Sequence, residues 1–332
     1  MHEVAAHAGV SPMTVSRVLS GDAKVREETR KRVQAAIAQL GYSPNIAARN
    51  LARAATVHIG LLYANPSANY LNELLVGVLE RSSRAGCQVL LEKCGTRSER
   101  SAIRKLLDDG VSGIILPPPL SESKAALESL RAANVPYIVV STGRAADSGL
   151  SVRINDFEAA AAMTRHLLSL GHRDIGFITG ATNHTASAQR HAGFVAALAQ
   201  QGLMPRPEWV KQGSFTYRSG LETAEQLLSG ARRPSAIFAS NDDMAAATIA
   251  VAHRLRLDVP GDVTVVGFDD TPIATTIWPA LTTIRQPVAA IAGKAVEMLL
   301  EEIRLRASGE TLQRPEQILD FTLMKRESCA AI

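Results

Sequence analysis

The sequence has few cysteines and no long apolar run. Its three cysteines, Cys87, Cys94 and Cys329, are odd in number and match no zinc or redox spacing, so we expect free thiols in a reducing compartment. No run of about 18 apolar residues is present, which excludes a helical membrane span. No charged-then-apolar leader precedes the first expected helix, and we therefore expect a cytoplasmic protein.

The sequence also lacks the motifs that usually bind metals or nucleotides. The chain has no cluster of metal-ligating residues and no Walker-type phosphate loop, so we predict neither a metal nor a nucleotide cofactor. With 332 residues, 46% hydrophobic and 20% charged, it has the composition of an ordinary globular protein rather than a disordered one. This length is enough for two or three domains.

Positive charge is concentrated at the N-terminal end. Residues 1–56 contain 8 Lys and Arg against 4 Asp and Glu, which leaves 28 of each sign in the remainder. The whole formal excess of +4 therefore lies in this short segment. A basic module on a neutral body is typical of proteins that contact the phosphates of nucleic acids.

Residues 3–21 predict two short helices joined by a tight turn. The first has apolar residues at helical spacing and ends at Gly9, because glycine adopts left-handed geometry without a Cβ penalty. Ser11 is a favourable N-cap for the second helix. Pro12 then falls at its first helical position, where the missing N–H costs nothing.

The second helix has an apolar face and a polar face. Val15, Val18 and Leu19 recur at helical spacing and are expected to face inward. The exposed set is Met13, Thr14, Ser16 and Arg17. Such side chains suit the major groove of DNA, where Arg can bond guanine and hydroxyls can hold phosphates. A helical hairpin with a solvated face is the alternative.

A loop, a third helix and a linker follow. Lys24, in the loop, is placed to reach a phosphate, and a helix is expected over 27–40, where the acidic start suits the positive end of the helix. Residues 43–55 have a short apolar face. A lone helix of about ten residues is marginal in water, so this one is expected to form fully only when paired and bound.

From residue 57 onward, apolar strand-like runs alternate with stretches of helical length. This pattern predicts an α/β body of two doubly wound parallel-sheet subdomains, one over about 57–155 and one over about 156–284. The chain is expected to cross back near 281–288, so that 288–318 rejoin the first subdomain. The predicted strands are 57–63, 87–92, 113–117, 137–140, 175–179, 236–240 and 263–268.

Ligands of open parallel sheets bind at the carboxyl ends of the strands, so polar residues just after strands are candidate contacts. Their carboxylates, amides and hydroxyls suit sugar hydroxyls. Asn and Asp at such places also cap helices, which leaves capping or interdomain bonding equally open for Asp242 and Asp270. The candidates are Tyr63, Asn65, Ser141, Thr142, Asn155, Asp156, Asn241, Asp242, Asp269 and Asp270.

The N-terminal motifs EVAAHAGVSPMTVSRVLSG and GYSPNIAARNLA resemble the headpiece of LacI/GalR family transcription regulators. The resemblance implies a helix-turn-helix headpiece over 1–42 and a hinge helix over 43–56, with Leu51 wedged between base pairs in the minor groove. It also implies a periplasmic-binding-protein-like body over 57–332, with 319–332 in the second subdomain. The implied DNA-binding residues are Ser11, Pro12, Met13, Thr14, Ser16, Arg17, Lys24, Asn45, Ala48 and Leu51.

The body resembles the same family in three motifs. SAQRHAGF indicates Arg190 as a ligand contact, SNDDMA indicates Asn241 and Asp242, and VGFDDTPIA indicates Asp269. Gln286 matches an interdomain position, while NPSANY has small residues where many relatives have aromatics. The implied effector-binding residues are Tyr63, Asn65, Asn155, Arg190, Phe215, Asn241, Asp242 and Asp269.

The function implied is a sequence-specific, DNA-binding regulator, most simply a repressor of carbohydrate-use genes that a small sugar-like effector modulates. A dimer is expected, because the sequence ends without a leucine-repeat helix. Purine-type effectors remain open. A solute receptor without DNA binding is an alternative that the basic headpiece disfavours. A glycosidase using Asp242 and Asp269 is another, but no distinct acid and nucleophile are present, so we predict no enzymatic activity.

Overall fold

The structure is a computed structural model that describes residues 2–11, 14, 15, 18, 26–39, 57–95, 98–145, 149–313 and 316–332. The chain divides into two compact units, Met1–Thr56 and Val57–Ile332. Of the helices described, none is long and apolar enough to span a membrane.

The N-terminal unit contains α1 (His2–Ala8) and α3 (Glu27–Gln39), which pack against each other. Gly9 ends α1 with a φ of 61°, the left-handed geometry predicted for it. Apolar residues of this unit are buried and form one small core, which includes Val15 and Val18, both predicted to face inward. Its members are Ala5, Ala8, Val15, Val18, Val33 and Ala36, with Val10 packed against them.

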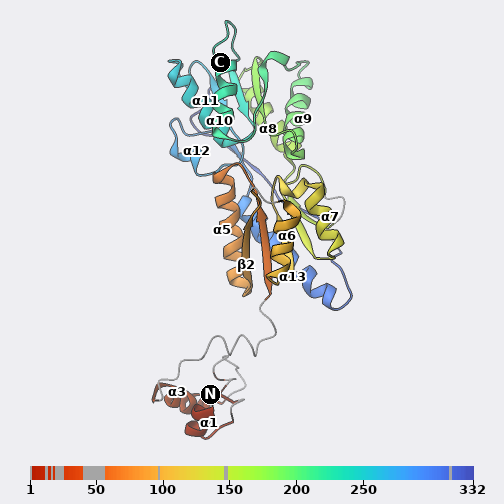
Figure 1. Cartoon of the computed structure of the whole chain (residues 1–332). Helices are drawn as coiled ribbons and strands as arrows, with labels where there is room; N and C mark the ends of the chain where they lie inside the picture. Colours follow the sequence, from red (N-terminus) through yellow and green to blue (C-terminus); the bar gives the residue numbers. More distant parts are fainter. Residues whose placement is uncertain are drawn as a thin grey trace. The chain divides into compact units, whose positions relative to one another are not determined.

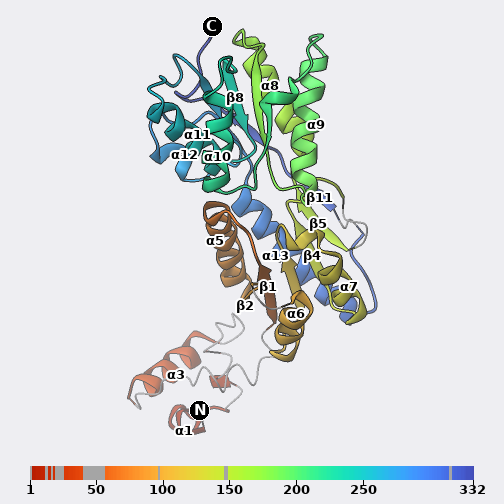
Figure 2. The ribbon, with the colours of Figure 1, turned by 45° about the horizontal axis from the view of Figure 1, so that its top comes forward.

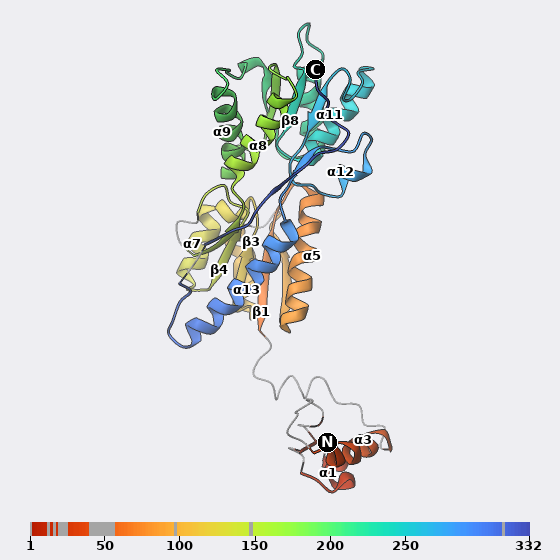
Figure 3. The ribbon, with the colours of Figure 1, turned by 180° about the vertical axis from the view of Figure 1, so that it is seen from behind.

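The first subdomain of the larger unit is built on a six-stranded sheet of order β11-β5-β4-β3-β1-β2, in which every pair is parallel. Helices α5 (Ala68–Ala85) and α13 (Val288–Ala307) pack together on one face, as seen from behind in Figure 3. Helices α6 (Glu99–Asp108) and α7 (Lys124–Ala132) cover the other. The strands are β1 (His58–Tyr63), β2 (Gln88–Lys93), β3 (Gly113–Leu116), β4 (Tyr137–Val140), β5 (Leu150–Arg153) and β11 (Glu316–Ile318).

The second subdomain has a parallel sheet of order β7-β6-β8-β9. Helices α8 (Asp156–Ser169) and α9 (Thr185–Ala199) cover one face, and α10 (Tyr217–Leu228) and α11 (Asp242–Arg254) cover the other (Figure 2). The strands and short helices are β6 (Ile175–Thr179), η2 (Pro207–Trp209), β7 (Val210–Gln212), β8 (Ala236–Ala239), β9 (Thr264–Val266) and α12 (Ile273–Thr276).

Three chain segments join the two subdomains (Figure 1). One runs from β5 into α8, one from β10 (Thr283–Arg285) into α13, and one from β11 into β12 (Thr322–Met324). Strands β10 and β12 pair antiparallel, with Ile284 opposite Leu323. The crossings therefore lie side by side and connect two bodies that each have their own sheet.

The predicted fold class is confirmed, and each of the seven predicted strands is present. Five further strands, β5, β7, β10, β11 and β12, were not predicted, because each has only three or four residues and lacks a continuous apolar run. Within the described residues, Cys87, Cys94 and Cys329 form no disulfide bond, as expected.

Candidate functional site

A small cavity lies between the two subdomains, near the carboxyl ends of several strands. Its volume is about 40 Å³. The first subdomain contributes residues at the ends of β1, β3 and β4, and the second contributes residues from α9 and from the loops after β7, β8 and β9. The lining consists of Asn65, Pro66, Ser67, Tyr70, Pro118, Ser141, His184, Ala186, Arg190, Phe215, Asn241, Asp269 and Gln286.

Arg190 is the charged centre of this cavity. It projects from α9 with only 5% of its surface exposed. Its Nε donates to Asp156 Oδ1 at 2.8 Å, and its Nη1 donates to the Ser240 carbonyl at 2.6 Å. The guanidinium carbon also lies 3.6 Å from the ring centroid of Phe268. Two buried partners and an aromatic face therefore fix its position and offset its desolvation.

Asp269 stands beside Arg190, with its Oδ1 3.6 Å from Arg190 Nη1. The same oxygen accepts a 2.6 Å hydrogen bond from Gln286 Nε2. Burial raises the pKa of Asp269 to about 7, although Arg190 acts in the opposite direction. Burial also raises the pKa of Asp156. The site thus combines one permanent cation with two carboxyl groups whose charge is disfavoured by burial.

The first-subdomain wall is held by short hydrogen bonds. Asn65 Oδ1 accepts from the Ser67 N–H at 2.8 Å, and its Nδ2 donates to the Pro118 carbonyl at 3.1 Å. Tyr70 Oη donates to Ser141 Oγ at 2.7 Å. Burial raises the pKa of Tyr70, so its phenol remains protonated and able to donate. These side chains are fixed by the first subdomain alone.

The opposite wall is aromatic. Phe215, with a φ of 62°, contacts the ring of His184 at a centroid distance of 5.2 Å, and Asn241 Nδ2 donates to the Phe215 carbonyl at 3.0 Å. Burial, with the nearby charge of Arg190, lowers the pKa of His184 to about 4. His184 is therefore neutral at pH 7. The Phe215 ring packs so closely on Gly180 that a Cβ there would lie 1.8 Å from its Cζ.

Two sets of hydrogen bonds connect the subdomains directly. In the first, Asp243 accepts from Ser67 Oγ at 2.5 Å and from Asn69 Nδ2 at 2.6 Å. These bonds join the first turn of α11 to the start of α5. The cleft is closed in this arrangement, because the two walls contact each other through buried polar groups.

The second set lies at the start of α9. Glu122, in the short helix η1 (Leu120–Glu122), accepts from the Thr185 N–H at 2.8 Å and from Thr185 Oγ1 at 2.7 Å. The Gly143 N–H in turn donates to Thr185 Oγ1 at 2.9 Å. A carboxylate of one subdomain thus caps a helix of the other.

Five of the predicted effector-binding residues line the cavity, namely Asn65, Arg190, Phe215, Asn241 and Asp269. Ser141 and Gln286 do so as well. Ser67, Tyr70, His184 and Asp243 are not among the residues predicted from the sequence. Ser67 and Tyr70 lie only two and five residues beyond Asn65, in the segment that follows the first predicted strand, and their polar side chains are the signal that could have identified them.

Three of the predicted effector contacts do not line this cavity. Tyr63 is still inside the β1 ladder, opposite Lys93, rather than beyond the strand end. Asn155 caps α8, with its Oδ1 accepting from the Glu158 N–H at 3.2 Å. Asp242 is 1% exposed, and hydrogen bonds to groups outside the cavity hold its carboxylate away from the lining.

Asp242 is bound on both carboxylate oxygens. Its Oδ2 accepts from the Thr271 N–H at 2.8 Å, and its Oδ1 accepts from Thr283 Oγ1 at 2.6 Å. It therefore joins α11 to the loop after β9 and to the crossing strand β10. Asp270 has a similar role, since it forms ion pairs with Arg285 and Arg326, each at 2.6 Å.

Of the predicted DNA-binding residues, the structure describes Ser11 and Thr14. Ser11 Oγ accepts from the Thr14 N–H at 3.2 Å, and the Ser11 carbonyl accepts from the N–H groups of Thr14 and Val15. This is the N-cap geometry expected of Ser11. The remaining ones lie outside the described residues: Pro12, Met13, Ser16, Arg17, Lys24, Asn45, Ala48 and Leu51.

Within the described ranges, no group of three or more His, Cys, Asp or Glu side chains is placed to hold a metal ion. The chemistry that the cavity offers is instead recognition. It presents hydroxyl, amide, carboxylate and guanidinium groups beside one aromatic ring, which is a set that binds a small polar molecule and fixes its orientation.

Comparison with known proteins agrees with this division of the chain. The family model of bacterial regulatory proteins, lacI family, matches residues 1–45, and that of a periplasmic binding protein-like domain matches residues 164–329. The HTH-type transcriptional repressor PurR of Actinobacillus pleuropneumoniae serotype 3 (strain JL03) is 35% identical over 321 residues, which cover 95% of this chain and 94% of that protein.

Two solved structures are similar over nearly the whole length. The transcriptional regulator CelR in complex with cellobiose has 29% identity and a TM-score of 0.75, and the match covers 98% of each chain. The Lac repressor dimer bound to operator and the anti-inducer ONPF has 28% identity and a TM-score of 0.78, covering 99% of this chain and 98% of that one. The chain therefore belongs to the lacI family of bacterial regulatory proteins.

Proposed function

We propose that the protein is a sequence-specific, DNA-binding repressor of carbohydrate-use genes whose affinity for its operator depends on a small sugar-like effector in the interdomain cleft. The observation that carries the proposal is the pairing of a helix-turn-helix unit, with Ser11 as the cap of its second helix, with a body whose central cavity is lined from two subdomains. The operator-bound Lac repressor is similar to this chain over 99% of its length, which supports this function.

The effector is proposed to be a neutral sugar or glycoside. Asp156 and Asp269 both pair with Arg190, so this cation is engaged by carboxyl groups of the protein rather than available to an anionic ligand. Phe215 provides an apolar face for the C–H surface of a sugar ring, and the amides of Asn65, Asn241 and Gln286 suit its hydroxyls. CelR, which binds cellobiose, supports the same class of ligand.

Effector binding requires movement of the subdomains. The present cavity, about 40 Å³, has room for a few water molecules, whereas ligand pockets usually enclose several hundred Å³. A sugar therefore enters when the contacts of Asp243 with Ser67 and Asn69 are broken. Binding shifts the balance between open and closed cleft, and this shift is what couples the cleft to the headpieces.

A homodimer is proposed as the DNA-binding form. Helix α5 exposes Val76 and Leu79, of which 41% and 50% of the surface is accessible, and Trp278 of the second subdomain is 72% exposed. Val76 and Leu79 lie three residues apart on α5 and form a small exposed apolar patch, which suits an interface between copies. The operator-bound Lac repressor is a dimer. The proposed operator is accordingly a pseudo-palindrome with two half-sites.

The direct test is selection of DNA sequences from a random pool by the full chain, followed by affinity measurements at about 50 and 200 mM salt. We expect an enriched pseudo-palindrome whose affinity falls steeply with salt. Arg17→Ala is expected to weaken selectivity, whereas the control Arg218→Ala, at an exposed position of α10, is expected to leave it unchanged. Enrichment of no sequence over random DNA, with sugar binding retained, would contradict the regulator and leave a solute receptor.

A further inference from the structure

Helix α9 differs from its neighbours in how it begins. Six helices in the described part of the larger unit start at a Ser, Thr or Asn whose side chain accepts a hydrogen bond from a backbone N–H of the first turn. At α9 the same position is occupied by His184, whose side chain makes no such bond. The side chain of His184 is therefore not used to begin the helix.

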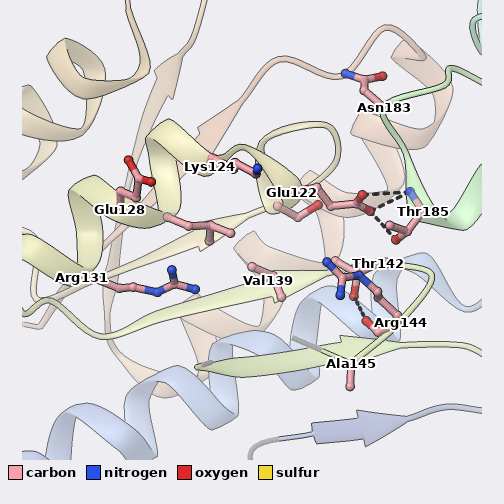
Figure 4. Close-up of a pocket in the computed structure, with 12 residues that line it drawn as sticks. Glu122, Lys124, Glu128, Arg131, Val139, Thr142, Arg144, Ala145, Asn183 and Thr185 are labelled. Atoms are coloured by element: carbon pink, nitrogen blue, oxygen red, sulfur yellow. Dashed lines mark hydrogen bonds between the residues drawn. The ribbon is translucent and has the colours of Figure 1, made fainter. Parts of the chain in front are cut away.

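The cap of α9 comes from the other subdomain instead. The carboxylate of Glu122, in η1, accepts from the Thr185 N–H at 2.8 Å and from Thr185 Oγ1 at 2.7 Å (Figure 4). Its negative charge also suits the positive end of the helix. The loop after β4 lies so close that a Cβ on Gly143 would overlap the backbone of Thr185. The first subdomain thus holds the start of α9 and releases the preceding side chain from capping.

His184 lines the central cavity. It is only 6% exposed and lies beside Phe215, with an angle of 42° between the two rings. Neither ring nitrogen of His184 has a hydrogen-bond partner among the residues that the structure describes, yet both keep some accessible surface. A buried polar group without a partner costs free energy, which a ligand in the cavity would recover.

The charge of His184 is set by its surroundings. Burial and the nearby charge of Arg190 lower the pKa of His184 to about 4, so the imidazole is neutral at pH 7. A neutral imidazole has one nitrogen that accepts a hydrogen bond and one that donates. A sugar hydroxyl can pair with either nitrogen, because it is both a donor and an acceptor.

We propose that His184 determines which effector the cleft selects, and that Glu122 of the first subdomain positions it. This inference rests on the proposed function, in which the central cavity takes a sugar-like effector. The apolar face of the sugar lies on Phe215, and a hydroxyl at the edge of the sugar ring meets the tilted imidazole. Glu122 does not touch the sugar. It acts by fixing the backbone of Thr185, the residue that follows His184.

The arrangement also lets the cleft open without losing this contact. The bond of Asp243 with Ser67 joins α11 to α5, whereas the bonds of Glu122 with Thr185 join η1 to α9, and the two sets share no residue. A cleft that opens at Asp243 therefore keeps His184 in place as long as Glu122 holds α9. The effector meets a side chain that is oriented before binding, which lowers the entropic cost of binding.

The test begins with isothermal titration of the full chain with D-glucose, D-galactose, D-mannose, cellobiose and lactose, and continues with the sugar that binds most tightly. His184→Phe keeps a ring of similar size beside Phe215 but removes both nitrogens, and is expected to weaken binding about tenfold. His184→Gln keeps a donor and an acceptor, so it should lose less. His253→Phe, at an exposed position of α11 outside the cavity lining, is the matched control and should bind as the wild type does.

A double-mutant cycle with His184→Phe tests the positioning role of Glu122. We expect Glu122→Ala to weaken sugar binding about threefold or more in the wild type and to have no effect once His184 is replaced. Glu301→Gln, at an exposed position of α13, is the control and should change neither protein. Monodeoxy derivatives of the sugar locate the contact, since one of them should lose affinity for the wild type but not for His184→Phe.

The outcomes separate this inference from the proposed function. Equal affinity of the wild type and a folded His184→Phe protein would overturn the role of His184 while leaving the sugar effector intact. Equal losses from Glu122→Ala in both backgrounds would overturn the positioning role. If none of the sugars binds, the sugar effector and this inference fail together, whereas the selection of operator DNA tests the regulator separately.

Discussion

The carboxylate of Asp243 accepts a 2.5 Å hydrogen bond from the hydroxyl of Ser67, although 176 positions separate the two residues in the chain. Ser67 belongs to the first subdomain and Asp243 to the second. Both are buried. The bond therefore exists only when the cleft is closed, and the stability of the closed form depends on it.

Removing this carboxylate is expected to favour the open cleft. Hydrogen bonds to a charged group contribute about 1.5 to 3 kcal/mol each, and Asp243→Ala removes two of them from the closed form. Because a sugar enters the open cleft, we expect titration calorimetry to show that the affinity for sugar increases by about tenfold or more. Asp108→Ala removes an exposed carboxylate of α6 and is the control. Equal affinities of the two variants would show that these bonds do not set the closure equilibrium.

Arg190 is expected to be essential for stability as well as for effector binding. Arg190→Met leaves Asp156 and Asp269 buried without their cation, and breaking a buried pair in this way costs about 3 to 5 kcal/mol. Urea unfolding measures the loss. Arg84→Met breaks an exposed pair with Glu80 and is expected to cost less than about 1 kcal/mol. Similar losses in both variants would argue against the buried network.

His184 gives the protein a predictable dependence on pH. Its pKa is lowered to about 4 in the folded state, from an ordinary value of 6.5. Between these values the unfolded chain binds the proton and the folded one does not, so stability falls as the pH decreases from 6.5 toward 4. The wild type should therefore lose about 2 kcal/mol relative to His184→Gln between pH 7 and pH 5.

Urea unfolding of both proteins at the two pH values measures this difference. Burial raises the pKa of Asp269 to about 7, so the folded state holds this proton more tightly than the unfolded chain does. The contribution of Asp269 to the free energy of unfolding therefore decreases as the pH rises toward 7, opposite to that of His184. That contribution is common to both proteins and cancels in the comparison. A wild type and a variant with parallel pH profiles would mean that His184 is protonated normally in the folded state.

Gly180 is expected to tolerate no side chain while Phe215 holds its position. A Cβ at residue 180 would overlap the ring, so Gly180→Ala must displace Phe215, at a cost of about 1 to 3 kcal/mol and with weaker sugar binding. In a Phe215→Ala background, Gly180→Ala should cost much less stability, because the ring that it would displace is absent. Gly95→Ala, which meets no atom within 4 Å, is the control for urea unfolding. An unaltered stability of Gly180→Ala would mean that the ring moves freely.

Much of the fold follows from local patterns in the sequence. Runs such as GIILP and YIVV are apolar throughout because strands buried on both faces need no polar side, and they became β3 and β4. Strands β10 and β12 have three residues each and are held mainly by pairing with each other. Local patterns cannot reveal a strand of that kind.

The sequence predicts where the candidate site lies in the fold, but it does not predict which way each side chain points. Polar residues after strands do gather at one edge of each sheet, and Arg190 and Asp269 line the cavity as predicted. The same reasoning selected Asp242, whose carboxylate bonds Thr271 and Thr283 instead. Position in the chain does not determine where a side chain points. The contact of Asp243 with Ser67 depends on how two separate sheets come together, which no local pattern encodes.

The proposed coupling between the cleft and the operator is reciprocal, as thermodynamic linkage requires. The measurement that tests it most directly is the affinity of the full chain for its sugar, by calorimetry, with and without saturating operator DNA. We expect operator to change the affinity for the sugar by the same factor by which the sugar changes the affinity for operator, on the order of 5 to 150-fold. An affinity for sugar that is identical with and without operator would contradict it.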